Sequence, residues 1–577
     1  MKKTGAWLAT YALEQVGVKF TFGIPGVHNT ELYDELNNSN IIEPVLVTHE
    51  GGGSFMADAI SRTTDGIGCM VVVPAAGLTH AASGIAEASL DGIAMLVITG
   101  GIRTDSDFVY QLHDMDQHAL MKPITKATFQ INSHEEIIST IYKAYDIATQ
   151  GEPGPVFIDL PANLQFLKGE VAQIFPYESQ KTSLPVDNQK LMLAAELLCD
   201  AKNPGIFAGW GSSKATQDLV ELAEWLAAPV ATTLQGLSVF PASHSLHVGM
   251  GMGRSAVPAA ENAFKEVDSL LAIGTRFSEI PTGSFGLRVP KNLVHLDINP
   301  DVFNANYPAE VCLEGDAAIL IPELLKAVKK IQPCKKDASS ISKKIAHDKW
   351  LYKQEWAKHD SGNRVNPSLF FNGVSKQLVN DDYIVCDDGN HTFLTAELMP
   401  IFKSGHFIAP TDFNAMGYGV PATIATKLSH PDKNVVGIVG DGAFLMTCME
   451  ILTATKYGIG PVICVFSDGE LSQIAQAQQI PYNRKTCTIL GAIDISGVAL
   501  AVGAEYIHLE TNEQIDTALQ KAMDASRKGK AVIVNVNVDY SKTTRFTKGA
   551  VKTNMKRFDL KTKVRFIGRA LVRKVTG

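Results

Sequence analysis

The chain alternates short apolar runs with longer stretches in which apolar residues recur at helical spacing, and this alternation falls into three blocks. The runs that we expect to form strands are Ile42–Thr48, Gly68–Val73, Ala94–Thr99 and Val156–Leu160, then Gly205–Ala208, Pro229–Thr233, Ser269–Ile273 and Leu293–Ile298, then Tyr383–Cys386, Asn434–Val439, Val462–Phe466 and Ala531–Val536. Repeated strand–helix units predict parallel sheets that helices cover on both faces. We therefore predict an α/β protein with three doubly wound parallel-sheet domains.

The three blocks set the expected domain boundaries. The first domain spans residues 1–170, the second 186–335 and the third 363–540. A Lys-rich segment without a strand pattern, 336–362, is the expected linker, and residues 541–577 form a tail. A length of 577 residues is too great for one hydrophobic core, which agrees with several domains.

Composition is that of a soluble globular enzyme, with 45% apolar and 19% charged residues. No apolar run approaches the roughly 20 residues that span a bilayer. The stretch Gly5–Leu13 is followed at once by Glu14, so we interpret it as an amphipathic helix rather than a signal peptide. The eight cysteines form no Cys-x-x-Cys pair, and Cys386 and Cys464 lie within apolar runs. Buried free thiols in a reducing cytoplasm are the expected state.

The net charge of −8 conceals a strongly basic tail. Residues 541–577 contain 12 Lys/Arg and one acid, a net of +11, so the preceding residues carry −19. The apolar residues of the tail recur at helical spacing between basic ones, at Leu560, Val564, Ile567, Leu571 and Val575. A basic amphipathic helix of this kind can lie on an anionic membrane, which predicts peripheral membrane contact. A solvated helix or an extension packed on the acidic body is the other interpretation, and nothing else indicates nucleic-acid binding.

Two carboxylates follow two apolar runs of the third block. The first run leads into Gly440-Asp441-Gly442-Ala443, and the second ends near Asp468, 27 residues after Asp441. If the runs are neighbouring parallel strands, both carboxylates emerge at the same edge of the sheet. This arrangement suits a divalent cation that holds a diphosphate. The two carboxylates are hard oxygen ligands, the glycines leave room for a ligand, and a helix that starts at Ala443 offers its N-terminal amides. Gly-Asp-Gly alone is also a common turn, so the spacing and the segments below carry the hypothesis.

The first and third blocks resemble distant repeats of each other. Glu50-Gly51-Gly52-Gly53 is followed by a small-residue helical stretch, and Met416-Gly417-Tyr418-Gly419 is followed by another. Each is a Gly-rich strand end that opens a helix able to pack closely against a neighbour.

The paired acids resemble the diphosphate-binding signature of thiamine-diphosphate (ThDP) enzymes, a Gly-Asp-Gly followed about thirty residues later by Asn or Asp. The resemblance implies an N-terminal pyrimidine-binding domain, a central Rossmann-like domain and a C-terminal diphosphate-binding domain. It implies bound ThDP and Mg²⁺, with Asp441, Asp468 and Glu470 as metal ligands. The further cofactor contacts that it implies are Gly417, Asn390, His391, Gly440, Gly442 and Ala443.

Two more residues receive roles from this resemblance. In ThDP enzymes a glutamate in a His-Glu setting contacts N1′ of the aminopyrimidine, and Glu50 matches it here, so it is the expected catalytic acid–base group. Met416 matches an apolar residue that lies under the cofactor and keeps it bent. Each residue also has a purely structural interpretation. Glu50 would be an acid at a helix N-terminus, favoured by the helix dipole, and Met416 would fill the core.

Within this superfamily the chain is similar above all to acetolactate synthase, through Gly249–Gly253, Ala272–Phe277 and His295–Pro300 of the middle block. In that enzyme the middle domain holds a non-redox FAD, so FAD is a further candidate cofactor. The implied reaction decarboxylates a 2-oxoacid and transfers the acyl carbanion to a second carbonyl. The implied assembly is a homodimer or homotetramer, with Glu50 facing Asp441 of the partner subunit.

Several substrate-side positions depart from the acetolactate synthase pattern. Leu160-Pro161-Ala162-Asn163 lacks a lysine, Ala477 stands near the place of a tryptophan, and Gly77-Leu78-Thr79-His80 replaces Gly-Ala-Thr-Asn. His28 lies where benzaldehyde-lyase-like relatives have an active-site histidine, and both His28 and His113 are candidates to transfer protons to a carbinol oxygen. An acyloin or 2-hydroxyacyl lyase (or carboligase) is therefore one alternative function. A flavin-linked 2-oxoacid oxidase held at the membrane by the tail is a second, and a ThDP-binding protein without catalysis is a third.

Overall fold

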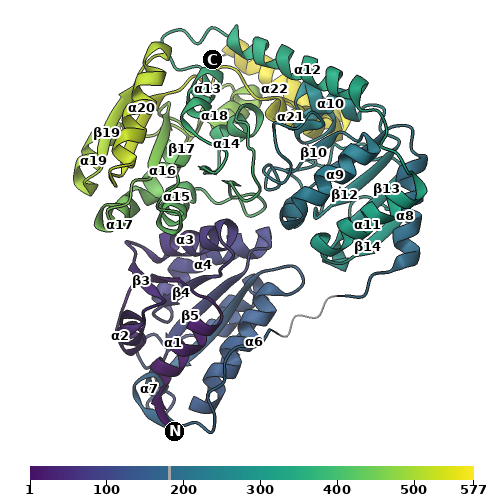
Figure 1. Ribbon diagram of the computed structural model, residues 1–577. Coiled ribbons are helices and arrows are strands. Elements are labelled where there is room, and N and C mark those ends of the chain that lie inside the picture. The colour runs from purple at the N-terminus through teal and green to yellow at the C-terminus, as the bar shows by residue number, and fades with distance from the viewer. Residues whose placement is uncertain (180–183, 577) are drawn as a thin grey trace.

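The computed structural model describes residues 1–179 and 184–576, which form three α/β domains, each built on a six-stranded sheet (Figure 1). All strand pairs within these sheets are parallel. Central strands such as β18 are buried over nearly their whole length, because helices cover both faces of a parallel sheet. The predicted fold class is confirmed.

The N-terminal sheet has the strand order β3-β2-β4-β5-β7-β6. Its strands are β2 (Phe20–Gly23), β3 (Glu43–Leu46), β4 (Gly68–Val72), β5 (Met95–Gly101), β6 (Ala127–Gln130) and β7 (Pro155–Pro161). Its helices are α1 (Gly5–Gln15), α2 (Thr30–Asn38), α3 (Glu50–Thr63), α4 (Ala76–Asp91), α5 (Gln117–Met121), α6 (Ile137–Thr149) and α7 (Ala162–Phe166). A short ribbon pairs β1 (Lys2–Thr4) with β8 (Lys168–Glu170). The amphipathic helix predicted at Gly5–Leu13 is α1, and Leu8, Ala12 and Leu13 are buried on its inner side.

The middle sheet has the order β11-β10-β9-β12-β13-β14. Its strands are β9 (Pro204–Ala208), β10 (Val230–Thr232), β11 (His247–Met250), β12 (Ser269–Ile273), β13 (Asn292–Asp297) and β14 (Val311–Glu314). Its helices are α8 (Asn188–Asp200), α9 (Thr216–Leu226), α10 (Pro258–Phe264) and α11 (Ala317–Ile331). The segment expected as a linker contains α12 (Ser339–Ala357), which packs on α10.

The C-terminal sheet has the order β16-β15-β17-β18-β20-β19. Its strands are β15 (Tyr383–Cys386), β16 (Phe407–Ile408), β17 (Val435–Gly440), β18 (Val462–Ser467), β19 (Glu505–Leu509) and β20 (Val532–Asn537). Its helices are α13 (Pro367–Gln377), α14 (Asn390–Leu398), α15 (Gly419–Ser429), α16 (Asp441–Thr447), α17 (Ile451–Lys456), α18 (Ser472–Tyr482), α19 (Ile495–Val502) and α20 (Ile515–Ser526).

The first and third sheets share one topology. Numbered within each domain, both read 2-1-3-4-6-5, so α3 and α15 follow equivalent strands and the expected repeat has a structural counterpart. The two helices pack against each other in the seam between the domains (Figure 1). The Tyr418 hydroxyl donates to Asp58 at 2.7 Å in this seam, and the Tyr418 and Phe55 rings meet edge to face.

A buried charge cluster joins the same two domains. Arg62 of α3 pairs with Asp58 at 2.6 Å and with Asp91 of α4 at 2.9 Å, and all three side chains are at most 1% exposed. Asp91 in turn accepts the Thr411 hydroxyl at 2.7 Å. Because Thr411 stands five residues before Met416, the cluster fixes the start of the segment that leads to Met416.

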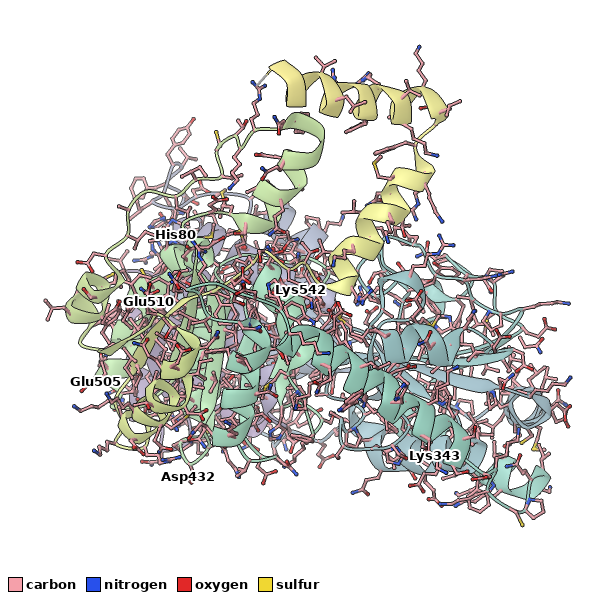
Figure 2. The ribbon with its side chains drawn as sticks, turned by 90° about the horizontal axis from the view of Figure 1, so that it is seen from above. His80, Lys343, Asp432, Glu505, Glu510 and Lys542 are labelled. Atoms are coloured by element: carbon pink, nitrogen blue, oxygen red, sulfur yellow. The ribbon has the colours of Figure 1, made fainter. Side chains whose placement is uncertain are left out.

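The basic tail forms two helices, α21 (Arg545–Arg557) and α22 (Leu560–Thr576). Helix α21 docks on the middle domain, where Asn554 donates to Ser284 and a Cβ atom on Gly549 would lie 2.3 Å from Ser255 Cα. Helix α22 contacts α18 and extends beyond the body of the molecule (Figure 2). Within the described ranges, no helix is both long and apolar enough to cross a membrane.

Candidate functional site

The turn after β17 brings the two predicted carboxylates together. Asp441 opens α16, and its Oδ2 accepts the main-chain N–H groups of Asp468 at 3.0 Å and Gly469 at 2.8 Å. Its Oδ1 accepts the N–H of Gly442 at 2.8 Å. Strands β17 and β18 are paired neighbours, so both acids do emerge at one edge of the sheet.

Both acids are held in a setting that disfavours two negative charges. Burial raises the pKa of Asp441 above its usual value, although main-chain donors oppose this. Burial, together with the neighbouring charges of Asp441 and Glu470, raises the pKa of Asp468 to about 6, although a hydrogen bond from Ser472 opposes this. A cation between the two carboxylates would relieve this strain, since an opposite charge favours the ionised forms. The pair therefore fits a divalent metal ion.

The His391 ring closes one side of this turn. A Cβ atom on Gly440 would lie 3.1 Å from His391 Cε1, so the ring lies directly on the glycine main chain. Burial lowers the pKa of His391 to about 3, which keeps the ring neutral. Its Nε2 is buried without a hydrogen-bond partner. Buried polar atoms are normally paired, so this nitrogen is suited to contact a polar ligand atom beside Asp441.

Helix α18 covers the same turn. Gln476 of α18 faces Asn390 at 3.5 Å and donates to the Tyr540 carbonyl at 3.1 Å. The buried Oε1 of Gln473, on the first turn of α18, also has no partner. Asn390 and His391, the first two residues of α14, thus lie between the Gly440 turn and α18.

The segment Met416–Gly419 is tied to the loop after β15. Asp387 is fully buried, and its two oxygens accept the N–H groups of Gly417 at 2.9 Å and Gly419 at 2.7 Å. A Cβ atom on Gly442 would lie 3.6 Å from Met416 Cε, so the end of Met416 reaches the Asp441 turn. Asp387 was given no role in the sequence analysis. The signal that could have found this residue is an acid that directly follows an apolar run and precedes a glycine turn.

Glu470 sits at the edge of the site. Its carboxylate forms an ion pair with Lys485, and its main chain bridges to Ile489. The side chain is therefore already neutralised by a cation, unlike those of Asp441 and Asp468.

Glu50 lies in a separate group of residues at the N-terminus of α3. Its side chain is 8% exposed, and Oε2 lies 3.1 Å from Nδ1 of His80. A Cβ atom on Gly77 would lie 3.1 Å from Oε1, so the carboxylate rests on the first turn of α4. His49 caps α3 by accepting the Gly51 N–H at its Nδ1. Sequence reasoning noted His80 only as a departure from a pattern.

His28 and His113 do lie together. Their rings meet edge to face with centroids 5.2 Å apart, and burial, then the His113 charge, lower the pKa of His28. His28 Nδ1 is buried without a partner. The neighbouring loop exposes large apolar side chains, namely Phe108 (84%), Val109 (75%), Tyr110 (95%) and Leu112 (65%).

Within one chain, the Glu50 group and the Asp441 group are separate. Among the described residues, no hydrogen bond or ion pair joins them. The chain just before Glu50 contacts Glu450 instead, because the Glu450 carboxylate accepts the Thr48 N–H at 3.1 Å. Glu450 lies after α16, and the seven residues of that helix alone rise about 10 Å from Asp441.

A large cavity of about 1330 Å³ lies at the meeting of the three domains. Numbered within its domain, the middle sheet reads 3-2-1-4-5-6, the order of dinucleotide-binding folds, and the cavity lies at the carboxyl ends of its strands. Gly211 and Lys214 after β9 and Arg276 after β12 line it. Arg276 pairs there with Glu152 of the first domain at 2.8 Å. Gly249–Gly253, singled out in the sequence, are not among the lining residues.

Comparison with known proteins agrees with this architecture. Three family models match the chain: "Thiamine pyrophosphate enzyme, N-terminal TPP binding domain" over residues 3–120, its "central domain" over 191–324 and its "C-terminal TPP binding domain" over 387–536. The acetolactate synthase large subunit of Haemophilus influenzae is 30% identical over 551 residues, covering 94% of this chain and 96% of that protein. The probable acetolactate synthase large subunit of Methanocaldococcus jannaschii is 33% identical over 540 residues, covering 90% of each. The isozyme 3 large subunit of Escherichia coli is 27% identical over 560 residues.

Proposed function

The chain belongs to the thiamine pyrophosphate enzyme family and is a ThDP-dependent enzyme close to acetolactate synthase, and on this premise we propose the reaction that it catalyses. We propose that it decarboxylates a 2-oxoacid and transfers the acyl group to a second carbonyl, with Mg²⁺ as the metal. Pyruvate is the proposed donor, because the relatives are named acetolactate synthases.

The Asp441 turn is the observation that carries this proposal. It combines two neighbouring acids of raised pKa, a buried unpaired His391 Nε2 and the first turn of α16. Asp441 and Asp468 would hold Mg²⁺, and His391 with the α16 amides would hold the diphosphate oxygens. Glu470 would join them only if it releases Lys485 or uses its main-chain carbonyl. Met416, fixed through Asp387, would support the cofactor between its rings.

When bound, ThDP supplies a nucleophilic carbon and an electron sink for the electrons that leaving CO₂ releases. The protein's part is to place that carbon and to manage protons. Glu50 would hold a proton at its Oε1 or Oε2 opposite N1′ of the aminopyrimidine. His28 and His113 would exchange protons with the carbonyl and carbinol oxygens of the substrate, and the neutral state of His28 suits an acceptor.

A complete site requires Glu50 from one chain and Asp441 from another in this proposal. Among the described residues of one chain no hydrogen bond or ion pair joins the two groups, as a shared site requires. Exposed apolar side chains beside the Asp441 group support it, since such patches mark protein interfaces. On the Asp441 side these are Leu445, Met446, Met449 and Leu452. The proposed assembly is at least a homodimer.

Two substrate-side departures shape the proposed pocket. Asn163, which stands where acetolactate synthase has an acid after its lysine, is buried and accepts the Thr104 N–H at 3.0 Å. It thereby anchors the loop that carries His113. Without the lysine the pocket has one positive charge fewer, which favours an uncharged carbonyl acceptor, and without the tryptophan it has more room for that acceptor.

Incubation with pyruvate, ThDP and Mg²⁺ tests the proposal. Formation of acetolactate and CO₂ is expected, and absence of both would remove the acetolactate assignment. The same assay with acyloins and an electron acceptor separates the lyase and oxidase alternatives. The relatives favour the synthase-type reaction over both.

FAD is the proposed occupant of the middle-domain cavity. The Rossmann strand order, the Gly209-Trp210-Gly211 turn after β9 and the cavity volume support a dinucleotide there. Arg276 and Lys214 offer positive charge toward its diphosphate. The absorption spectrum of the purified protein decides the point, because bound flavin makes a protein yellow; a colourless protein contradicts the proposal.

The last helix is proposed to contact anionic membranes from the cytoplasmic side. Leu560 (78% exposed), Val564 (62%) and Leu571 (60%) are uncovered on α22, between basic residues. Side chains of Ile567 and Val575, which belong to the same pattern, lie outside those that the structure describes. Sedimentation with anionic vesicles should require residues 560–577 and weaken at high salt. Equal sedimentation of the truncated chain would contradict the proposal.

A further inference from the structure

One helix of the N-terminal domain holds both oxygens of the Glu50 carboxylate. Gly77 and His80 are three residues apart on α4 and therefore lie on the same face of it. Gly77 supports Oε1, and His80 Nδ1 meets Oε2 at 3.1 Å. The His80 side chain is 51% exposed, whereas that of Glu50 is 8% exposed. His80 thus connects a buried carboxylate to the surface of the chain.

The hydrogen bonds around the two histidines assign their tautomers. His49 Nδ1 accepts the Gly51 N–H at 3.0 Å, so His49 carries its proton on Nε2. An ionised carboxylate only accepts, so His80 donates through Nδ1 and its Nε2 remains an acceptor. The two rings are stacked, with centroids 4.7 Å apart, which fixes the plane of His80.

The same three groups place ligand atoms within 4.8 Å of one another, a spacing that a metal ion could use. Hydrogen bonds already occupy the nitrogens that face inward, because His49 Nδ1 receives Gly51 and His80 Nδ1 faces Glu50. The arrangement is therefore that of a carboxylate–imidazole pair, with His49 stacked beside it.

We propose that His80 is a positioning residue that orients Glu50 and relays protons between its carboxylate and solvent. The inference rests on the proposed function of Glu50. In the relay, a solvent water gives a proton to Nε2 of His80 and becomes hydroxide, while Nδ1 gives its proton to Oε2 of Glu50; the reverse steps return both protons. The negative charge thereby passes from Glu50 to the solvent and back. The asparagine that the family pattern has at this position can donate a hydrogen bond but cannot relay a proton.

The first test uses the protein without cofactor and measures acylation of His80 by diethyl pyrocarbonate, followed by peptide mass spectrometry. A carboxylate that accepts from one imidazole nitrogen makes the other more basic. Glu50→Gln should therefore slow His80 acylation severalfold. The matched control is His508 on β19, which is paired with Glu510 and similarly exposed (50%). Its acylation rate should not change in Glu50→Gln. An unchanged His80 rate in Glu50→Gln would overturn the pairing.

The second test measures exchange of the ThDP C2 proton in deuterium oxide. His80→Asn and His80→Ala should slow exchange by about 10-fold to 100-fold while the ThDP dissociation constant stays within about twofold. Added imidazole should restore exchange in His80→Ala but not in Glu50→Gln. His508→Asn should exchange normally.

Exchange at the normal rate in His80→Asn, or no rescue of His80→Ala by imidazole, would overturn the relay and leave the proposed function intact. Failure of the unmodified protein to bind ThDP would overturn the proposed function instead. In that case the acylation test still decides whether Glu50 and His80 are coupled.

Discussion

Asp441 Oδ2 accepts the main-chain N–H of Asp468 at 3.0 Å, so one acid of the proposed metal site fixes the backbone of the other. The Gly469 N–H reaches the same oxygen. The turn after β18 is therefore shaped before any ligand arrives, and the Asp468 carboxylate has a defined position beside Asp441. Preorganised ligands of this kind bind a cation without a large ordering cost.

Removal of the Asp468 carboxylate should weaken the metal site without unfolding the turn. In Asp468→Ala the main-chain bonds to Asp441 persist, but one metal ligand is lost. We expect Mg²⁺-dependent ThDP binding to weaken by about 100-fold, since even outer partners of metal ligands contribute 10-fold to 100-fold. Titration calorimetry measures this. Asp494→Ala, which removes an exposed acid that caps α19, should bind normally. Unchanged affinity in Asp468→Ala would remove this residue from the metal site.

His391 should matter for ThDP binding more than for folding. Its Nε2 has no partner in the chain, so His391→Phe loses no protein contact at that atom. We expect ThDP affinity to fall by about tenfold or more, the value of a hydrogen bond to a charged group. His295 is a matched control, because it is also buried with one unpaired nitrogen but lies in the middle domain. Equal ThDP affinities in His391→Phe and His295→Phe would contradict the diphosphate contact.

Asp388 should make the protein without cofactor less stable as pH rises. Burial raises the pKa of Asp388 to about 6, against about 3.9 in an unfolded chain. A raised pKa in the folded state favours the protonated form, so its stabilisation is complete below about pH 4 and is lost as pH rises through about 6.

The variant Asp388→Asn tests this, because it stays neutral and replaces an oxygen, Oδ1, that has no partner. The free energy of unfolding of this variant should match that of the unmodified protein near pH 4. At pH 8 it should be higher by up to about 3 kcal/mol, which thermal unfolding at both pH values measures. A difference independent of pH would contradict the assignment. Asp494→Asn should show no such rise.

Loss of Arg62 should destabilise the seam between the first and third domains. Arg62→Met leaves Asp58 and Asp91 buried without their cation, which costs about 3–5 kcal/mol. Arg103→Met removes an exposed partner of Asp105 and should change stability far less, because solvent screens that pair. Thermal unfolding of both variants makes the comparison. A similar small effect for both would mean that the buried cluster contributes little.

The sequence predicted the interior of the fold better than its edges. Each of the twelve predicted runs overlaps a strand, because central parallel strands are buried on both faces and read as continuous apolar runs. Besides the short pair β1 and β8, six strands of the three large sheets were missed, and five of these six (β6, β11, β14, β16 and β19) are sheet edges. Edge strands such as Glu505–Leu509 mix charged and apolar residues, so periodicity alone does not separate them from loops.

The candidate site shows a similar limit. Local motifs singled out Asp441, Asp468 and His391, and the structure places each of them after a strand of the same sheet. His80, Asp387 and Arg62 were not given roles. The partner of His80 is Glu50 and that of Asp387 is Gly417, each 30 residues away in the sequence. The Arg62–Asp91 pair spans 29 residues. No local sequence pattern encodes pairings over such distances.

The most direct test of the central claim mixes two defective chains. Glu50→Gln and Asp441→Asn, each with a different affinity tag, are co-expressed and the assembly carrying both tags is isolated. If Glu50 works with Asp441 of the partner subunit, each mixed dimer contains one intact site and one doubly altered site. Exchange of the ThDP C2 proton should then recover to about half the normal rate, while each variant alone remains inactive. A mixed assembly as inactive as its parents would contradict the shared site.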